Sequence, residues 1–248
     1  MPDANISWPT APAELDARDN EIHVFAAPLD LPPLELERRA ATLSPGEKER
    51  AGKFKFEKHR NRFIAGRGLM RETLGRVLQS NPAALEFGYS ERGKPELAAP
   101  FLTSGIHFNL AHSENLALLA VTRIGSVGVD VEHIRPVNNV EELVARFFSK
   151  RENELFQKLA DTGKPAAFFN LWTRKEALLK ATGEGIGSRL NLVEVSFLPG
   201  EPAQLLAISE DTALAAQWTL QAFSPAPGFV GALAIQSQNP RVSCWTWK

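Results

Sequence analysis

Twice along this chain of 248 residues, a stretch with helical periodicity is followed by a series of short strand-like runs. The first such block extends from about residue 44 to 132, and the second from about 140 to 247. Short alternating runs separated by turn residues are typical of antiparallel strands. The pattern therefore predicts an α+β protein of two similar lobes, each with helices packed on a mainly antiparallel sheet. We assign residues 1–125 to an N-terminal lobe and residues 126–248 to a C-terminal lobe.

The helix boundaries carry the strongest local signals. Ser44-Pro45-Gly46-Glu47 combines an N-cap serine, a proline at the first helical position and a glutamate three residues after the serine, which predicts a capping box. The clearest helical pattern runs from Pro165 to Thr182, and Gly183 and Gly185 are expected to end it, because glycine commonly follows a helix C-terminus.

Composition limits the classes of protein that fit. The net charge of −1 gives the whole chain no general attraction for nucleic acid or anionic lipid. Cys244 has no cysteine partner, and the longest apolar run, Leu116–Val121, is far shorter than the roughly 20 residues that span a bilayer. With no secretory signal pattern at residues 1–20, we expect a cytoplasmic protein that uses neither a membrane nor nucleic acid.

The charge is nevertheless unevenly distributed. Between Lys48 and Arg76 the chain has ten Lys and Arg residues against three Glu residues, a balance of +7. This segment could bind an anion, or it could be the solvated face of a helix, and the charge count alone leaves both open.

Two acidic residues suggest a metal site. In Gly128-Val129-Asp130-Val131-Glu132, residues two apart on a strand point to the same face, so Asp130 and Glu132 project together. Mg²⁺ is usually held by one or two carboxylates together with substrate phosphates. The alternative is a solvated strand end with two unrelated acids.

Three further segments carry candidate residues. Glu176 and Lys180 are four apart in a helical segment and share a face, either as part of a site or as a surface ion pair. His112 and Ser113 end a strand at a turn whose amides could receive a phosphate. Lys94 lies in the turn Gly93-Lys94-Pro95. The G-x-S-x-G, H-E-x-x-H, Walker A and G-x-G-x-x-G motifs are absent from the sequence.

In order, these segments resemble the Sfp-type 4′-phosphopantetheinyl transferases of the phosphopantetheinyl transferase superfamily. The resemblance covers roughly residues 44–190, and the ordered combination is specific although each motif alone is common. The matching segments are RFIAGRGLMR (62–71), GKP (93–95), FNLAHS (108–113), GVDVE (128–132), RFFSK (146–150) and WTRKEALLK (172–180).

The resemblance implies a reaction and a site. The phosphopantetheine arm of coenzyme A would be moved to a serine of an apo acyl or peptidyl carrier protein, as in the holo-[acyl-carrier-protein] synthase type, releasing 3′,5′-ADP. Asp130, Glu132 and Glu176 would hold Mg²⁺ or Mn²⁺. Glu176 would accept the serine proton, and Lys180 would neutralise the phosphates. The remaining implied coenzyme contacts are Lys94, His112 and Ser113 at the phosphate groups and Arg50 and Arg62 at the adenosine 3′-phosphate.

The resemblance also implies a pseudo-twofold arrangement of the lobes, and the length suits a monomer. One departure is Ala111, where the family pattern has a serine before the histidine. Two rival functions remain: a non-catalytic module of the same fold that binds coenzyme A or a nucleotide, and a nucleic-acid-binding protein that uses the segment from Lys48 to Arg76. The near-neutral total charge argues against the second.

Overall fold

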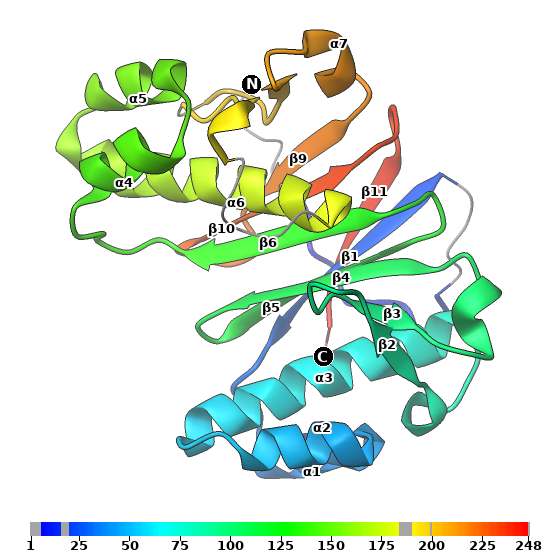
Figure 1. Cartoon of the computed structure of the whole chain (residues 1–248). Helices are drawn as coiled ribbons and strands as arrows, with labels where there is room; N and C mark the ends of the chain where they lie inside the picture. Colours follow the sequence, from blue (N-terminus) through cyan, green and yellow to red (C-terminus); the bar gives the residue numbers. More distant parts are fainter. Residues whose placement is uncertain (1–5, 16–19, 184–189, 199, 248) are drawn as a thin grey trace. The chain divides into compact units, whose positions relative to one another are not determined.

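The computed structural model describes residues 6–15, 20–183, 190–198 and 200–247 (Figure 1), so the expectation for Gly185 lies outside the described residues. The chain divides into two compact units. The N-terminal unit comprises Trp8–Ile124 and Val242–Lys248, and the C-terminal unit comprises Met1–Ser7 and Gly125–Arg241.

The N-terminal unit is built on a four-stranded sheet with the order β11-β1-β5-β4, in which β1 and β4 each pair antiparallel with β5. A small hairpin of β2 and β3 lies outside this sheet. The elements are β1 (Glu21–Pro28), α1 (Pro33–Thr42), α2 (Pro45–Gly52), α3 (Glu57–Val77), β2 (Phe87–Tyr89), β3 (Pro95–Leu97), β4 (His107–Ser113), β5 (Leu116–Thr122) and β11 (Arg241–Thr246), with 3₁₀ turns at Pro82–Ala84 and Phe101–Thr103.

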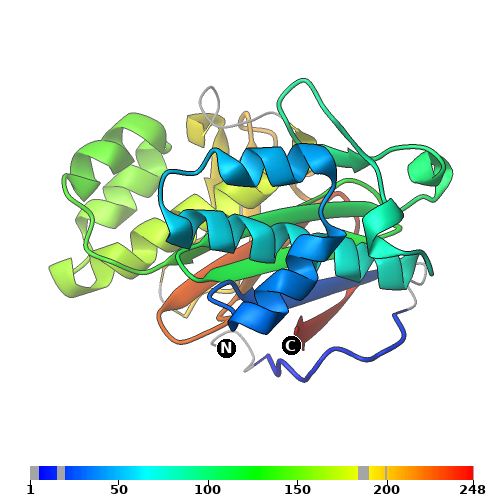
Figure 2. The same ribbon diagram turned by 90° about the horizontal axis from the view of Figure 1, so that it is seen from below.

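Three helices cover one face of this sheet. Seen from below in Figure 2, α1, α2 and α3 lie in front of the strands, and α3 lies nearest to them. Helix α2 starts at the predicted capping box, because Ser44 Oγ accepts from the Glu47 amide and Glu47 Oε2 accepts from the Ser44 amide. Helix α1 approaches α3 closely at Gly68, where a Cβ atom would lie 2.4 Å from Cβ of Arg39.

The C-terminal unit has a three-stranded antiparallel sheet with the order β6-β10-β9 and a separate hairpin of β7 and β8. Helix α6 lies along β6 and β10 (Figure 1). The elements are β6 (Val127–His133), α4 (Val140–Phe147), α5 (Lys150–Gln157), α6 (Lys164–Thr182), β7 (Val193–Val195), β8 (Leu205–Ile208), α7 (Thr212–Ala215), β9 (Thr219–Phe223) and β10 (Phe229–Ile235), with 3₁₀ turns at Asp161–Gly163 and Leu190–Leu192.

The two units repeat one topology. Each has a strand, three helices, a short hairpin and two longer strands in the same order, with α7 and β11 as additions to this repeat. In the N-terminal sheet β1 lies next to β5, and β5 lies next to β4. In the C-terminal sheet β6 lies next to β10, and β10 lies next to β9. The predicted α+β class, with helices on antiparallel sheets, is therefore confirmed.

Two details differ from the expectations. Because Ile124-Gly125-Ser126 lies between two strand-like runs, the sequence predicts a short hairpin connection there; β5 and β6 belong to different sheets, so this prediction is wrong. The domain assignment put residues 242–247 in the C-terminal lobe, whereas β11 lies beside β1 in the N-terminal sheet. Trp247 explains this position: it is buried in the N-terminal core, where its ring meets that of Phe25 edge-on at 5.5 Å.

None of the helices among the described residues is both long and apolar enough to cross a membrane.

Candidate active site

A close contact between β6 and α6 sets the geometry of the C-terminal site. A Cβ atom on Gly128 would lie 1.9 Å from the carbonyl oxygen of Ala177 and 2.5 Å from the amide nitrogen of Ala181. Only a residue without a side chain lets the strand and the helix backbone approach so closely. A glycine inside a predicted strand often marks a close backbone approach, and this was the signal in the sequence from which the role of Gly128 could have been predicted.

The close contact brings Asp130 of β6 to Lys180 of α6. The Lys180 ammonium lies 2.6 Å from Asp130 Oδ1 and also donates to the carbonyl oxygen of Val129 at 3.3 Å. Asp130 is buried, whereas the Lys180 side chain is 29% exposed. The two predicted residues therefore form an ion pair with one buried partner.

Glu176 lies one helical turn before Lys180, and only 2% of it is exposed. Burial and, to a lesser extent, the charge of Asp130 raise the pKa of Glu176 to about 7, against the opposing charge of Lys180. Burial also raises the pKa of Asp130 to about 6, against the opposing charge of Lys180. Because Asp130 and Glu132 both act on the pKa of Glu176, the three predicted carboxylates influence one another electrostatically.

Two acceptor atoms at this site are buried without hydrogen bonds. Within the described part of the chain, Asp130 Oδ2 and Glu176 Oε1 have no hydrogen-bond partner. An unsatisfied buried carboxylate oxygen carries a desolvation penalty, and a bound cation would remove that penalty for both of these oxygens.

Glu132 is held differently. Its Oε2 accepts from Nη1 of Arg135 at 3.1 Å, and the same nitrogen donates to the carbonyl oxygen of His133. The guanidinium of Arg135 also stacks over the ring of Phe169 at 4.8 Å. Arg135 belongs to none of the sequence motifs. Its part in the site follows only from its contact with Glu132, three residues before it.

The donor chemistry fits a hard divalent ion. Carboxylate oxygens are the ligands that Mg²⁺ prefers, and both oxygens without a hydrogen bond are carboxylate oxygens. Across residues 6–15, 20–183, 190–198 and 200–247, however, no group of three or more His, Cys, Asp or Glu side chains is gathered as a ready-made metal site. In this structure the Lys180 ammonium neutralises Asp130, and Arg135 neutralises Glu132.

A buried ion pair on another side of α6 fixes the helix in place. Lys175 is fully buried, and its ammonium contacts Glu152 Oε2 at 2.5 Å and the carbonyl oxygens of Leu190 and Val193 at 2.7 and 2.5 Å. Glu152 Oε1 accepts from the amide of Val195 at 2.9 Å. One lysine thus ties α6, α5 and β7 together beside Glu176.

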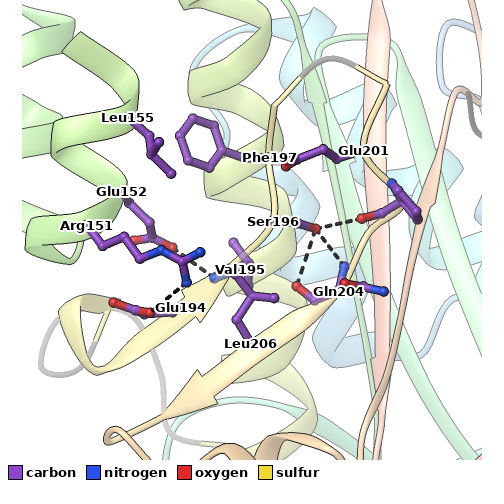
Figure 3. A pocket seen from close by; sticks show the side chains of 11 residues that line it. Arg151, Glu152, Leu155, Glu194, Val195, Ser196, Phe197, Glu201, Gln204 and Leu206 are labelled. Atoms are coloured by element: carbon purple, nitrogen blue, oxygen red, sulfur yellow. Dashed lines mark hydrogen bonds and ion pairs between the residues drawn. The ribbon is translucent and has the colours of Figure 1, made fainter. Parts of the chain in front are cut away.

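The cavity in Figure 3 lies between α5 and the β7–β8 hairpin. It has a volume of about 300 Å³, and Arg151 and Glu194 form an ion pair of 3.7 Å at its edge. A larger cavity of about 790 Å³ adjoins the N-terminus of α5. Neither cavity is lined by a residue that the sequence analysis predicted for the site.

The N-terminal unit holds the other predicted residues. Arg50, near the end of α2, stacks over Phe63 with its guanidinium 5.4 Å from the ring centre. It lines a cavity of about 450 Å³ together with Arg71, Phe87 and Tyr89. This cavity offers aromatic groups and the guanidinium of Arg50, whereas Arg71 pairs at 2.7 Å with Glu47, which also lines the cavity.

Lys94 follows the turn residue Gly93, whose φ of +79° suits glycine. Burial lowers the pKa of Lys94, and burial together with the charge of Lys94 lowers the pKa of His107. His107 is the first residue of β4, so Lys94 acts electrostatically on the start of this strand.

His112 and Ser113 end β4 on opposite faces. His112 is exposed, whereas Ala111 and Ser113 are buried on the other face. Ser113 faces Leu116 across the strand pair, so Glu114 and Asn115 form the turn, with Glu114 at a φ of +48°. The predicted histidine and serine therefore lie directly before a tight turn.

Arg62, on the first turns of α3, already has two acidic partners. It lies 2.6 and 2.9 Å from the two carboxylate oxygens of Asp30, and 3.4 Å from Glu114 Oε2. Its side chain is only 12% exposed. The hydrogen bonds that Arg62 donates to Asp30 raise the pKa of Arg62 and lower the pKa of Asp30.

Within the C-terminal unit, the structure thus brings Asp130, Glu176 and Lys180 to one place. Arg50, Arg62, Lys94, His112 and Ser113 belong to the N-terminal unit. The sequence analysis did not identify Asp30 or Glu114, which lie 32 and 52 residues from Arg62 and carry no motif.

Comparisons with known proteins match both units. The model of the 4′-phosphopantetheinyl transferase superfamily matches residues 126–235, and the model of the 4′-phosphopantetheinyl transferase N-terminal region matches residues 33–124. The chain is 43% identical to the 4′-phosphopantetheinyl transferase HetI of Nostoc sp. over 96% of this chain and 98% of that protein.

Two further matches are more distant. The chain is 31% identical to the 4′-phosphopantetheinyl transferase Sfp of Bacillus subtilis over 65% of this chain and 69% of that protein. The crystal structure of the Thermotoga maritima holo-[acyl-carrier-protein] synthase covers 46% of this chain and 64% of its own, with 23% identity and a TM-score of 0.36. The near-complete match to HetI and the two family models establish that this chain belongs to the 4′-phosphopantetheinyl transferase superfamily.

Proposed function

We propose that this chain transfers the 4′-phosphopantetheine arm of coenzyme A to a serine of an apo acyl or peptidyl carrier protein, and that 3′,5′-ADP is released. The observation that carries the proposal is the pair of buried acceptor oxygens on Asp130 and Glu176 beside the ammonium of Lys180. Such a cluster suits a reaction in which negative charge must be neutralised rather than a covalent intermediate formed.

Asp130, Glu132 and Glu176 are the residues that would hold Mg²⁺ or Mn²⁺, and the ion would supply charge neutralisation for the diphosphate. Glu176 accepts the proton of the attacking serine, because its carboxylate is buried and its pKa is raised to about 7, close to neutral pH. Lys180 offsets the negative charge that develops on the leaving diphosphate oxygen.

The coenzyme contacts come from the N-terminal unit. Arg50 lines a cavity with aromatic walls, which suits a charged nucleotide group. Lys94 and His112 supply cationic and hydrogen-bonding groups for phosphate oxygens, and Ser113 adds a hydroxyl. This assignment also gives the +7 segment around Arg50 an anionic partner.

The test is intact-mass spectrometry of purified apo carrier proteins incubated with the enzyme, coenzyme A and Mg²⁺. We expect a gain of one phosphopantetheine group, abolished by EDTA. Asp130→Ala and Glu176→Ala should each reduce the rate by roughly 100-fold or more, as expected when transition-state charge stabilisation is lost. Asp161→Ala is the matched control, because Asp161 is an exposed acid whose pKa is lowered by Lys164.

The second candidate is a non-catalytic module that binds coenzyme A. It would show coenzyme A binding but no mass gain with any acyl or peptidyl carrier protein. The presence of Asp130, Glu132 and Glu176 together argues against it, because a module that only binds coenzyme A does not need three carboxylates for a metal ion. Full activity of both alanine variants would contradict the proposed site.

A further inference from the structure

Arg62 lies at the centre of a small cluster that joins three parts of the N-terminal unit. Asp30 follows β1, Arg62 lies near the start of α3, and Glu114 forms the turn between β4 and β5. The guanidinium binds Asp30 with two nitrogens, at 2.6 and 2.9 Å, and reaches Glu114 with the third at 3.4 Å. All three nitrogens of the guanidinium are therefore engaged by this chain's own carboxylates.

A backbone hydrogen bond closes the same cluster. The amide of Leu29 donates to the carbonyl oxygen of Asn115 at 2.8 Å, one residue away from each of the two acids. The segment after β1 is thus fastened to the β4–β5 turn by its backbone as well as through Arg62. This double connection restrains the turn against movement relative to α3.

The turn itself has an unusual conformation for its residue type. Glu114 has a φ of +48°, a region that glycine, asparagine and aspartate adopt more readily than glutamate. A bond from the Glu114 carboxylate to a fixed guanidinium offsets this conformational preference. The turn directly follows His112 and Ser113, so its position sets theirs.

We propose that Arg62 is a positioning residue, which holds the His112–Ser113 end of β4 in place through Glu114 and Asp30, and is not itself a ligand of the 3′-phosphate of coenzyme A. The proposal rests on the proposed function, since it assumes that His112 and Ser113 contact the coenzyme. With two carboxylates within hydrogen-bonding distance, the guanidinium would have to give up ion pairs before it could bind a phosphate.

The two roles predict opposite effects on coenzyme binding when the negative charge at position 114 is removed. If Arg62 positions the turn, Glu114→Gln removes part of the restraint and weakens coenzyme binding. If Arg62 binds the phosphate directly, Glu114→Gln removes a competing anion and tightens binding or leaves it unchanged. Asp30→Asn gives the same contrast from the other side of the cluster.

The experiment is isothermal titration calorimetry with coenzyme A and Mg²⁺, without a carrier protein, on Arg62→Gln, Glu114→Gln and Asp30→Asn. Each should raise the dissociation constant about fivefold, and the Arg62→Gln/Glu114→Gln double variant should bind no more weakly than Arg62→Gln, because coupled residues are non-additive. In the transfer assay KM should rise while kcat stays within about twofold. Arg38→Gln is the matched control, because Arg38 lies outside the segment from Lys48 to Arg76 and its side chain is 60% exposed beside Glu72.

Several results would overturn the positioning role: unchanged or tighter binding by Glu114→Gln, additive losses in the double variant, or unchanged binding by Arg62→Gln. If Arg62→Gln also destabilises the fold, Glu114→Gln still tests the positioning role, because the Glu114 side chain is 54% exposed. Wild-type coenzyme binding without any transfer would contradict the proposed catalysis and leave the positioning role measurable. Absence of coenzyme binding by the wild type would overturn both.

Discussion

At the scale of single residues, Glu176 carries a charge that the fold does not favour. Its pKa is raised to about 7, so between about pH 4.5 and 7 the native state binds more protons than the unfolded chain. In the presence of EDTA, this residue therefore makes the folded state less stable as the pH rises through that window. Glu176→Gln should remove the effect and stabilise the metal-free protein at pH 8 by on the order of 1–3 kcal/mol.

Thermal unfolding of both proteins with EDTA at pH 5.5 and pH 8 measures the difference. The gain in melting temperature of Glu176→Gln over the wild type should be larger at pH 8 than at pH 5.5. An equal gain at both pH values would show that the carboxylate does not titrate as described. The same variant should lose transfer activity, so stability and activity would move in opposite directions.

The residues of the site differ in how far the sequence could predict them. Motifs singled out Asp130, Glu176 and Lys180, and the structure brings these three together although Asp130 and Lys180 lie 50 residues apart. No motif could give the partners of Arg62, because an ion pair across 52 residues depends on how a turn and a helix meet in space. The family resemblance had implied instead that Arg62 contacts the adenosine 3′-phosphate.

At the scale of elements, the contact of β6 with α6 depends on Gly128. Gly128→Ala would put a Cβ atom 1.9 Å from the Ala177 carbonyl oxygen, and the strand and helix would have to separate. We expect a loss of more than about 3 kcal/mol in the free energy of unfolding, or no folded protein, because backbone atoms cannot move aside as a side chain can.

Gly125→Ala is the control for this change, because a Cβ atom there meets nothing within 4 Å. Chemical denaturation of the two variants and the wild type compares their stabilities. Equal midpoints for Gly128→Ala and Gly125→Ala would contradict the close approach of β6 and α6.

The buried ion pair that holds α6 gives a second prediction at this scale. Lys175→Met would leave Glu152 as a buried carboxylate without its cation, and removing one partner of a buried pair commonly costs about 3–5 kcal/mol. Lys150→Met removes a lysine whose side chain is 91% exposed and should leave the denaturation midpoint unchanged. A similar midpoint for both variants would show that the Lys175 pair contributes little.

Helices with terminal signals were the elements that the sequence predicted best. Helix α2 begins at the capping box of Ser44, and Gly183 ends α6 with a φ of +75°. Helix α1 was not predicted, because Pro33–Thr42 has no side chain that caps its start and is rich in charged residues. The short strand β8 was also not predicted, because its pairing with β7 is a tertiary contact rather than a local pattern.

At the scale of the whole molecule, the N-terminal unit depends on residues from the far end of the chain. Trp247 is 1% exposed in its core, and Arg76 stacks over its ring at 4.0 Å. Trp247→Ala should cost about 3–5 kcal/mol, as for other buried aromatic residues. Hydrogen exchange should speed up in β1 and β5 and stay unchanged in β6 and β10.

Equal loss of protection in both units would show that they unfold together. Thr42→Ala is a suitable control, because its hydroxyl donates only to the carbonyl oxygen of Arg39 at the end of α1. It should leave the exchange rates of both sheets as they are in the wild type.

The position of β11 beside β1 has a consequence for synthesis on the ribosome. Residues 8–124 emerge first, but the strand that lies next to β1 follows only after the whole C-terminal unit has been made. During that interval the nascent N-terminal half has an open strand edge at β1 and an unfilled place beside Phe25, features that favour aggregation and chaperone binding. The part of the protein that is translated first is thus the part that matures last, and a gene cut between the two units would leave its product in that immature state.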